Sequence, residues 1–264
     1  MCSPAIINDV QRELSRRRFI TATALGTAGA MIVSDPAGAQ QAPVRLPKGF
    51  RTVHDLTHTF SPRLPVYPLF TPVRIRQRFD FQKDGFFANE VTFDEHTGTH
   101  MDAPLHFIPG GLSADRLPAD RLIAPLAVVS IAARAAKDPD TLLTVDDLLA
   151  WEKRHGRLPA GAVVAMHCGW DMKDTSHTPG FSEEAARFLV DQRAIVGVGV
   201  DTLSLDAAVA KKFVAHLAFL GAGKYGVELL ANLETVPAAG ATIILGAPKH
   251  EGASGGPVRA LAVA

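Results

Sequence analysis

One segment of eleven residues, 96–106, carries most of the chemistry that this sequence offers. It contains three histidines and one aspartate in the pattern H-x-G-T-H-x-D-x-P-x-H. Neutral imidazoles and carboxylates are the donors that borderline divalent cations prefer. The density of such donors at close spacing indicates a metal site that includes His96, His100 and Asp102.

These donors can reach one ion only if the chain bends between His96 and His100. On a straight strand the two residues would lie about 13 Å apart, at about 3.3 Å per residue. Gly98 is the position where a tight bend costs least, and Pro104 prevents a strand ladder from continuing. We therefore predict a compact loop that brings both imidazoles and Asp102 to one cation.

Two other interpretations of this segment are weaker. In the first, it is a turn whose polar side chains satisfy backbone groups, but each added ligand-type residue reduces the chance of coincidence. In the second, it is a structural zinc site, but such sites are usually closed by cysteines, which the segment lacks. An open, catalytic site is favoured. His106 can face the same cavity as an acid–base group, because the unperturbed pKa of histidine is close to neutrality.

Two further candidates lie far along the chain, and the residues alone leave both open. His216 falls on the apolar face of an expected helix, where a hydrogen-bonded core histidine is the simpler interpretation. Glu228 lies between Val227 and Leu229, and a buried carboxylate needs a partner or a metal. Cys168 follows an apolar strand candidate, so we interpret it as a small buried hydrophobe without a catalytic role.

The elements that must position these residues combine buried strands with amphipathic helices. Thr144, with Asp147 three residues on, predicts a capped helix, and Ser182 before two glutamates predicts another. A third helix is expected over about 204–220. Apolar or alternating runs predict strands at 126–132, 162–166, 194–200, 241–245 and, half-buried, 86–95. The sum is a mixed α/β domain with more strand than helix.

Composition limits the classes of partner. The chain has 264 residues and 47% hydrophobic content, which is enough apolar material for one large domain with a core. Lys+Arg and Asp+Glu are both 27, so no basic excess favours nucleic acid or an anionic membrane surface. We therefore expect a small-molecule substrate and no nucleic-acid partner.

The beginning of the chain has the composition of an export signal. An arginine triplet at 16–18 precedes small and apolar residues over 21–33, and A-G-A at 37–39 supplies a cleavage site. The pattern resembles a twin-arginine signal, and its apolar run is short against the about 20 residues that span a bilayer. We expect a periplasmic or secreted protein with no membrane span after cleavage. The expected organisation is a signal over 1–39, a linker over 40–50 and a single domain over 51–264.

Several blocks of the sequence resemble the cyclase superfamily, whose members include bacterial kynurenine formamidase (arylformamidase) and isatin hydrolase. Residues 96–106 fit the family's H-x-G-T-H-x-D-x-P-x-H signature without a departure. Residues 54–58 resemble its D-L-S/T-H opening, and 198–206 resemble its G-x-D-T-x-S-x-D block. The tail 251–260 follows in family order, so the resemblance extends from about residue 50 onward.

The resemblance implies a fold and a ligand set. The implied fold is the family's swivelling β/β/α arrangement around a mixed sheet, assembled as a homodimer or homotetramer. The cofactor would be one or two divalent ions per subunit, zinc or, as the alternative, manganese. The implied roles are His96, His100 and Asp102 for a first ion, Asp102, His216 and Glu228 for a second, and His106 as catalytic acid and base.

The expected activity is hydrolysis of a small amide by metal-activated water. The substrate would be an N-formyl aryl amine, such as the N-formylkynurenine of tryptophan catabolism, or a cyclic amide such as isatin, which makes the chain an arylformamidase-like amidohydrolase. The alternatives are a lactone or cyclic-ester hydrolase, a dehydrating cyclase, and a periplasmic metal- or ligand-binding module without turnover. Candidates for an aromatic pocket wall are Phe86, Phe87, Phe107 and Trp170.

Overall fold

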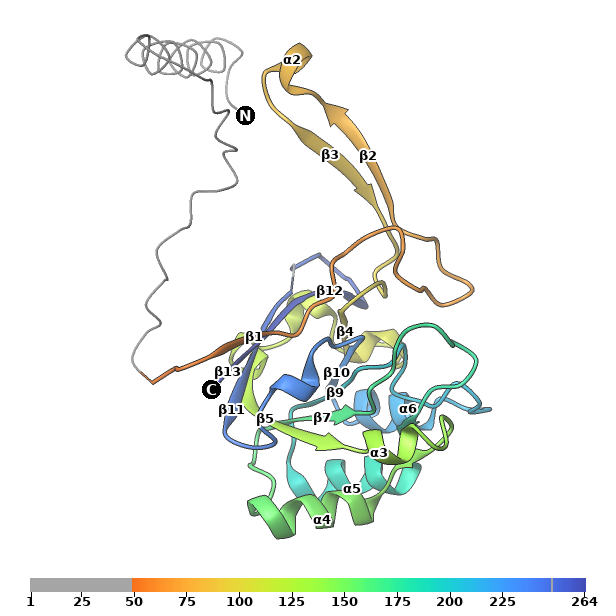
Figure 1. The fold of residues 1–264 in the computed structure, drawn as a ribbon, viewed down its shortest axis with the longest axis vertical. Coiled ribbons are helices and arrows are strands. Elements are labelled where there is room, and N and C mark those ends of the chain that lie inside the picture. Colours follow the sequence, from red (N-terminus) through yellow and green to blue (C-terminus); the bar gives the residue numbers. More distant parts are fainter. Residues whose placement is uncertain (1–48, 248) are drawn as a thin grey trace, which may run out of the picture. The chain divides into compact units, whose positions relative to one another are not determined.

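The computed structural model describes residues 49–247 and 249–264, and this part of the chain is built on a mixed β-sheet. The described residues fall into two compact units, one formed by Ile75–Val91 and the other by the remaining described residues. Figure 1 shows the elements in chain order. The expected signal over 1–39, and all of the expected linker except its last two residues, lie outside the described residues.

In the described residues, one sheet has nine strands in the order β1-β13-β11-β5-β7-β9-β10-β4-β12, and two small sheets pair β2 with β3 and β6 with β8. The strands are β1 Val53–Asp55, β2 Arg74–Phe79, β3 Ala88–Thr92, β4 His100–Asp102, β5 Ile123–Ser130, β6 Leu142–Leu143, β7 Val163–His167, β8 Gly180–Phe181, β9 Gly197–Val200, β10 Tyr225–Glu228, β11 Ala241–Gly246, β12 Gly255–Pro257 and β13 Arg259–Val263. The helices are α2 Phe81–Asp84, α3 Ala132–Ala135, α4 Val145–His155, α5 Glu183–Arg193 and α6 Val214–Gly221, with short 3-10 turns η2 Pro104–His106, η3 Ala114–Arg116, η4 Ala119–Leu122 and η5 Leu233–Thr235.

The central parallel strands consist mainly of apolar residues, and both of their faces are buried over most of their length. Successive side chains of a strand point to opposite faces. On β5, Leu126 and Val128 enter one hydrophobic core, whereas Ala127 and Val129 enter a second core against the helices. The strands predicted from the apolar runs are therefore confirmed, as β5, β7, β9 and β11, with small shifts at their ends.

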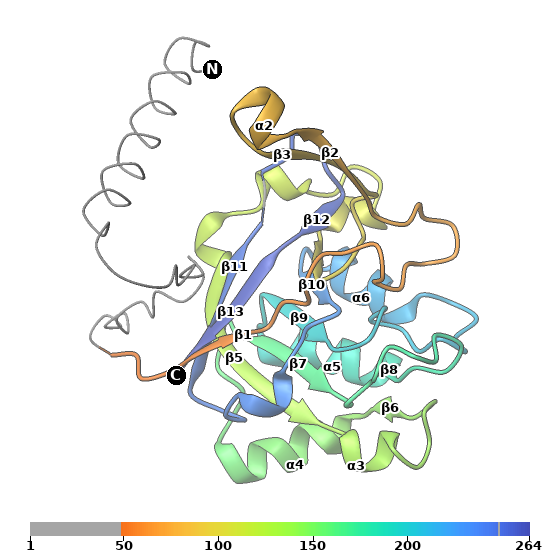
Figure 2. The same cartoon turned by 45° about the horizontal axis from the view of Figure 1, so that its top comes forward.

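The large sheet curls, so that its distant strands share one core. Met101 on β4 and Val227 on β10 belong to the same buried cluster as Ile243 on β11 and Ala260 on β13. These strands lie toward opposite ends of the strand order. Only a curled sheet brings such strands around one apolar interior, and Figure 2 shows this arrangement.

Helices α4 and α5 cover one face of the sheet, as Figure 2 shows. Thr144 caps α4, and the side chain of Asp147 bonds back to the Thr144 backbone in a reciprocal capping box. Ser182 caps α5 by accepting a hydrogen bond from the backbone N–H of Ala185. Both predicted helices are confirmed. Within the described residues, none of the helices combines the length and apolar character that crossing a membrane requires.

The helix predicted over about 204–220 is wrong in its first half, because α6 begins only at Val214. The backbone of Leu205 is committed elsewhere: its N–H donates to Glu228, and its carbonyl accepts from the N–H of Phe181. Those bonds exclude the hydrogen bonding of a helix at this position. Residues 201–213 therefore form a loop at the end of β9.

The predicted strand over 86–95 forms as β3, but its predicted half-burial is wrong. On β3 only Ala88 is partly buried, and the other four residues are exposed, Val91 at 43% among them. The alternation of apolar and polar residues is present, but a two-stranded hairpin supplies no second layer to cover its apolar side. Phe79 packs on Phe86, and Phe81 stacks on Phe87, within this hairpin unit.

Candidate metal centre

The chain bends between His96 and His100 because Gly98 adopts a left-handed backbone. Its φ is +67°, a region that glycine enters without steric cost. A Cβ atom at this position would lie 3.0 Å from side-chain atoms of both Leu64 and Phe60. The bend predicted at Gly98 is thus present, and the surrounding packing also excludes a larger residue.

The pairing of β4 with β10 brings three candidate ligands to one face of the sheet. His100 pairs directly with Glu228, and Asp102 pairs with Gly226. Directly paired residues share a face, and so do residues two apart on one strand. The side chains of His100, Asp102 and Glu228 therefore point to the same side.

Both sheet neighbours of Asp102 are glycines, and the space around the carboxylate requires this. Gly226 faces Asp102 on β10, and Gly255 faces it on β12. A Cβ atom on Gly226 would lie 2.9 Å from Leu205, and one on Gly255 would lie 2.6 Å from the His96 ring. Alanine at Gly255 would displace His96 or the β4 backbone, and alanine at Gly226 would press on Leu205.

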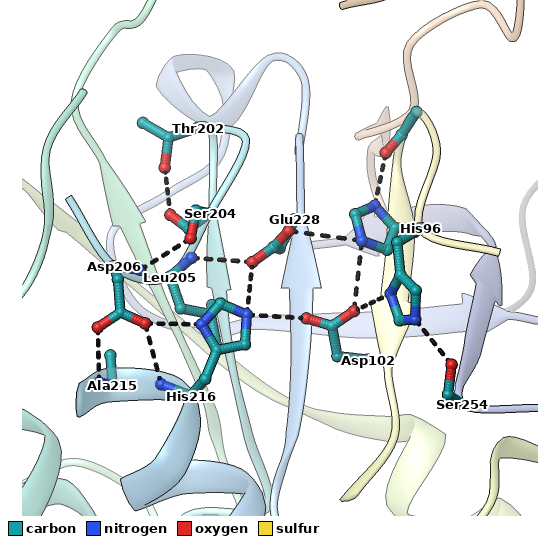
Figure 3. Close-up of polar contacts among 12 residues, drawn as sticks. His96, Asp102, Thr202, Ser204, Leu205, Asp206, Ala215, His216, Glu228 and Ser254 are labelled. Carbon is teal, nitrogen blue, oxygen red and sulfur yellow. Dashed lines mark hydrogen bonds and ion pairs between the residues drawn. The ribbon is translucent and has the colours of Figure 1, made fainter. Parts of the chain in front are cut away.

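Asp102 is the centre of the cluster and contacts three imidazoles, as Figure 3 shows. Its Oδ1 lies 2.6 Å from His96 Nδ1 and 3.3 Å from His100 Nε2, and its Oδ2 lies 3.5 Å from His216 Nε2. Burial alone would raise the pKa of Asp102, but the pairing with His100, and then with His216 and His96, lowers it well below its usual range. Asp102 is therefore a buried carboxylate that keeps its charge.

Glu228 adds a second carboxylate on the opposite side of the same imidazoles. Its Oε2 lies 3.4 Å from His100 Nε2, and its Oε1 lies 3.2 Å from His216 Nε2 and accepts a 2.9 Å hydrogen bond from the Leu205 N–H. Burial would lower the pKa of His100, but Asp102 and Glu228 outweigh burial and raise it to about 9. Two buried carboxylates at this spacing require positive charge between them.

His216 is buried at the start of α6 and is tied to the cluster at both ring nitrogens. Its Nδ1 lies 2.6 Å from the carboxylate of Asp206, while its Nε2 faces Asp102 and Glu228. The side chain is 5% exposed. The simpler interpretation, a hydrogen-bonded core histidine, therefore explains why His216 is buried. It does not explain why three carboxylates surround the His216 ring.

His106 lies at the end of the turn η2 with its ring stacked on His96. The two ring centroids are 3.7 Å apart, and Phe107 contacts His106 edge-on at 4.8 Å. Burial lowers the pKa of His106 to about 4; the charge of Asp102 acts in the opposite direction, and the neighbouring histidines lower the pKa further. His106 is therefore a neutral imidazole near pH 7, in a state that can accept a proton.

The donor atoms of the cluster fit a divalent cation. In the described residues, two triplets have ligand atoms within 4.8 Å of one another, His96–Asp102–His106 and His100–Asp102–Glu228. Two buried atoms of the cluster, His100 Nε2 and Asp102 Oδ2, make no hydrogen bond to the described residues. An unsatisfied buried polar group costs about 1–3 kcal/mol, and a cation would satisfy both atoms. The structure thus brings the six predicted site residues together. One difference is that the ligand atoms of His96 and Asp102 form a triplet with His106, whereas the family resemblance implies His100 as their partner.

Three residues of the site have no role in the sequence-based prediction. Ser254 lies 2.8 Å from His96 Nε2 and donates a 2.6 Å hydrogen bond to the carboxylate of Glu95. Asp206 holds the other side of the cluster through His216. Ser254 and Asp206 occur in the family-like blocks 251–260 and 198–206, which is the signal that the sequence offers for them. The partners of Ser254 lie 158 and 159 residues away, and that of Asp206 lies across a loop of irregular course.

A cavity of about 510 Å³ opens onto this cluster. His96, His100, His106, His216 and Glu228 line one part of it. Four aromatic side chains line another part, namely Tyr67, Phe70, Phe107 and Phe213. The remaining lining is a mixture of apolar residues and of polar residues that include Thr178, Ser204 and Asp206. None of the residues that line the cavity is a lysine or an arginine.

The predicted aromatic wall is correct for one of four residues. Phe107 lines the cavity and stacks on His216 with ring centroids 4.6 Å apart. Trp170 is not among the lining residues; its indole N–H donates to the carbonyl of Asp174 and its ring packs on the helix-side core. Phe86 and Phe87 belong to the hairpin unit, whereas the residues that line the cavity all belong to the larger unit.

The fold and the cluster define an α/β protein with a buried histidine–carboxylate centre suited to a divalent cation. Residues 54–207 match a family model described as "Putative cyclase". This chain therefore belongs to the cyclase family, as its sequence motifs predicted.

Relatives with known names support this membership. The chain is 36% identical over 249 residues to an isatin hydrolase of Roseibium aggregatum. This alignment covers 83% of this chain and 94% of the relative. Among solved structures, isatin hydrolase A from Labrenzia aggregata, bound to benzyl benzoate, is 34% identical with a TM-score of 0.76 and covers 80% of this chain and 93% of its own. Isatin hydrolase A from Ralstonia solanacearum is 36% identical, also with a TM-score of 0.76, and covers 80% and 91%. The predicted mixed-sheet fold, with more strand than helix, is confirmed.

Proposed function

We propose that this chain is a metal-dependent hydrolase that opens a neutral cyclic aryl amide of the isatin type. The observation that carries the proposal is that five residues of the histidine–carboxylate cluster line a cavity that also presents four aromatic side chains. Aromatic walls suit a flat aryl substrate, and the cluster can present a cation to its carbonyl group. The relatives named isatin hydrolase support the same class of reaction.

The charge of the cavity wall favours a neutral cyclic amide over N-formylkynurenine. N-formylkynurenine carries an α-amino group and an α-carboxylate, and a carboxylate is costly to bury without a positive partner. Outside the metal centre, the lining residues include no lysine or arginine that could pair with this carboxylate, whereas Asp206 is acidic. Isatin is flat and uncharged, so its binding needs no such partner.

In this proposal His106 moves the proton that amide cleavage requires. A divalent cation, when bound, polarises a carbonyl group and lowers the pKa of water toward neutrality. As water adds to the carbonyl carbon, the neutral imidazole of His106 accepts its proton. His106 then gives the proton to the ring nitrogen as the C–N bond breaks, which leaves an aryl amine and a carboxylic acid. The acid loses its own proton to solvent near pH 7. The aromatic wall excludes bulk water from the reacting groups.

We assign the cation to the donors around Asp102, with zinc first and manganese as the alternative. The ligands would be His96, His100, Asp102, His216 and Glu228, for one or two ions per subunit. Imidazole donors suit zinc, and a carboxylate-rich set also suits manganese. Asp102 belongs to both donor triplets, which supports it as a bridge if two ions bind.

The purified protein is expected to hydrolyse isatin at a kcat/KM at least about 100-fold above that for N-formylkynurenine, because an unpaired buried charge costs several kcal/mol. Loss of the isatin absorbance and appearance of the aryl amine measure turnover. A strong chelator is expected to stop the reaction, and Zn²⁺ or Mn²⁺ to restore it.

Other outcomes of this assay identify other functions. Comparable turnover of both substrates would contradict the argument from wall charge, and full activity in chelator would contradict the metal-dependent mechanism. Turnover of a lactone alone would indicate a cyclic-ester hydrolase. Release of water from an open-chain acid would indicate a dehydrating cyclase. Metal binding without any turnover would indicate a binding module.

We also propose that the chain forms a homodimer or homotetramer through its β2–β3 hairpin. A two-stranded hairpin is marginally stable alone, and exposed aromatic side chains are typical of interfaces. Phe81 is 67% exposed and Phe87 is 48% exposed. Light scattering on a sizing column is expected to show an oligomer that Phe81→Ser with Phe87→Ser dissociates, whereas Leu69→Ser, at an 84% exposed position outside the hairpin, does not. A wild-type monomer at micromolar concentration would contradict the proposal.

For localisation, we propose export to the periplasm or beyond the cell through the twin-arginine pathway. The support is the arginine triplet at 16–18, the weakly apolar run after it and the A-G-A site at 37–39. This pathway carries folded proteins, so the cation would be acquired before export.

A further inference from the structure

Asp206 is a buried carboxylate whose two oxygens both contact residues at the start of α6. Oδ1 accepts a 2.8 Å hydrogen bond from the Ala215 N–H, and Oδ2 accepts one of 3.2 Å from the His216 N–H. Oδ2 also lies 2.6 Å from His216 Nδ1. Asp206 is 2% exposed, so these three contacts account for its placement (Figure 3).

These contacts determine which nitrogen of His216 faces the cluster. A charged carboxylate only accepts hydrogen bonds, so the Nδ1 of His216 must carry the proton in this contact. The other nitrogen, Nε2, then points between Asp102 Oδ2 at 3.5 Å and Glu228 Oε1 at 3.2 Å. Metal-bound imidazoles are commonly oriented in this way by a carboxylate on the far nitrogen.

We infer that Asp206 is a positioning residue that holds His216 with Nε2 as the metal-binding nitrogen. The inference rests on the proposed metal-dependent function. A positioning role accounts for these contacts, because each of them ties Asp206 to the backbone or to the ring at the start of α6. Asp206 is adjacent to Leu205, whose N–H orients Glu228, so this one loop orients both ligands that come from outside segment 96–106.

Asp206 also caps α6, and a useful experiment must separate this structural role from the orienting role. Phe213, the residue before α6, makes no capping side-chain bond, and Asp206 takes that place from further upstream. Asp206→Asn keeps the size of the side chain. In one orientation, the amide oxygen of the asparagine accepts from the Nδ1–H of His216, but its NH2 group then faces a backbone N–H, which is also a donor. In the other orientation, the NH2 group donates to Nδ1 of His216, and the proton of the imidazole must move to Nε2.

The experiment measures the affinity for Zn²⁺ and Mn²⁺ by competition with a chromophoric chelator, together with thermal unfolding in excess strong chelator. Asp206→Asn is expected to weaken the cation bound through His216 by roughly 10- to 100-fold, the usual effect of losing an outer partner of a ligand. In a His216→Ala background, Asp206→Asn is expected to cause no further loss, because residues that act through one another are not additive.

Asp201→Asn is the matched control. Asp201 is a buried aspartate in the same loop that accepts hydrogen bonds from the backbone N–H groups of Cys168 and Gly169 and does not contact His216. Its replacement is expected to lower the unfolding temperature without changing metal affinity.

Three results would overturn the inference. These are unchanged metal affinity in Asp206→Asn, an equal loss in the His216→Ala background, or an equal loss in Asp201→Asn. If Asp206→Asn does not fold, Asp206→Ser, which retains a capping oxygen, replaces it in the same cycle. Absence of cation binding by the wild-type protein would instead reject the proposed metal centre itself.

Discussion

Replacing Asp102 with asparagine is expected to abolish turnover and to weaken cation binding more than any other single change in the cluster. Asp102 contacts His96, His100 and His216, and it belongs to both groups of donor atoms. The amide removes the negative charge and points an NH2 group at one of its partners. The loss of affinity is expected to exceed the roughly 10- to 100-fold that is typical when only an outer partner of a ligand is lost.

Metal content after gel filtration and chelator competition measure this effect, with circular dichroism to show that the fold is intact. Asp147→Asn is a suitable control, because it removes a hydrogen-bonded carboxylate from the capping box of α4. The control is expected to lose about 1 kcal/mol of stability and no metal affinity. Metal affinity at the wild-type level in Asp102→Asn would show that the cation does not bind at this carboxylate.

Replacing His106 with alanine is expected to lower kcat for isatin by roughly 10²- to 10⁴-fold, the usual contribution of a positioned acid–base group. Cation affinity is expected to change little, although a nitrogen of His106 lies within ligand range of His96 and Asp102. The reason is that the remaining donors around Asp102 still include His100, His216 and Glu228.

The two measurements together identify the role of His106. Loss of turnover with retained metal supports acid–base action, whereas loss of both makes His106 a ligand. Unchanged turnover removes His106 from the mechanism. His167→Ala serves as the control, because His167 is a partly buried histidine at the end of β7 that does not line the cavity.

Features of the fold with a local cause could be predicted from the sequence. Thr144 and Asp147 form their capping box within one helical turn, and Ser182 caps α5 in the same local way. The apolar runs of the central strands reflect burial on both faces. The helix expected over 204–220 failed because its competing bonds, from Leu205 to Phe181 and Glu228, join segments that are remote in sequence.

In the candidate site, too, the local features could be predicted from the sequence and the long-range contacts could not. The spacing in residues 96–106 predicts the bend at Gly98 and the local donors, because that geometry depends on one short segment. His216 and Glu228 could be connected to it only through the family resemblance, since periodicity describes burial and not partners. The sequence pattern predicts no role for Asp206, because the contact with His216 depends on the course of an irregular loop.

The alignment of β4 with β10 has a consequence for how the protein can fail. A slip of one residue would turn Met101 toward the cavity and drive His100 and Asp102 into the apolar interior that Met101 now occupies. Such a sheet would bury two charged groups among hydrophobic side chains and would also lack two of the five proposed ligands. Correct strand alignment and catalytic competence are therefore a single event in the assembly of this molecule, and a misaligned sheet would retain no partial activity.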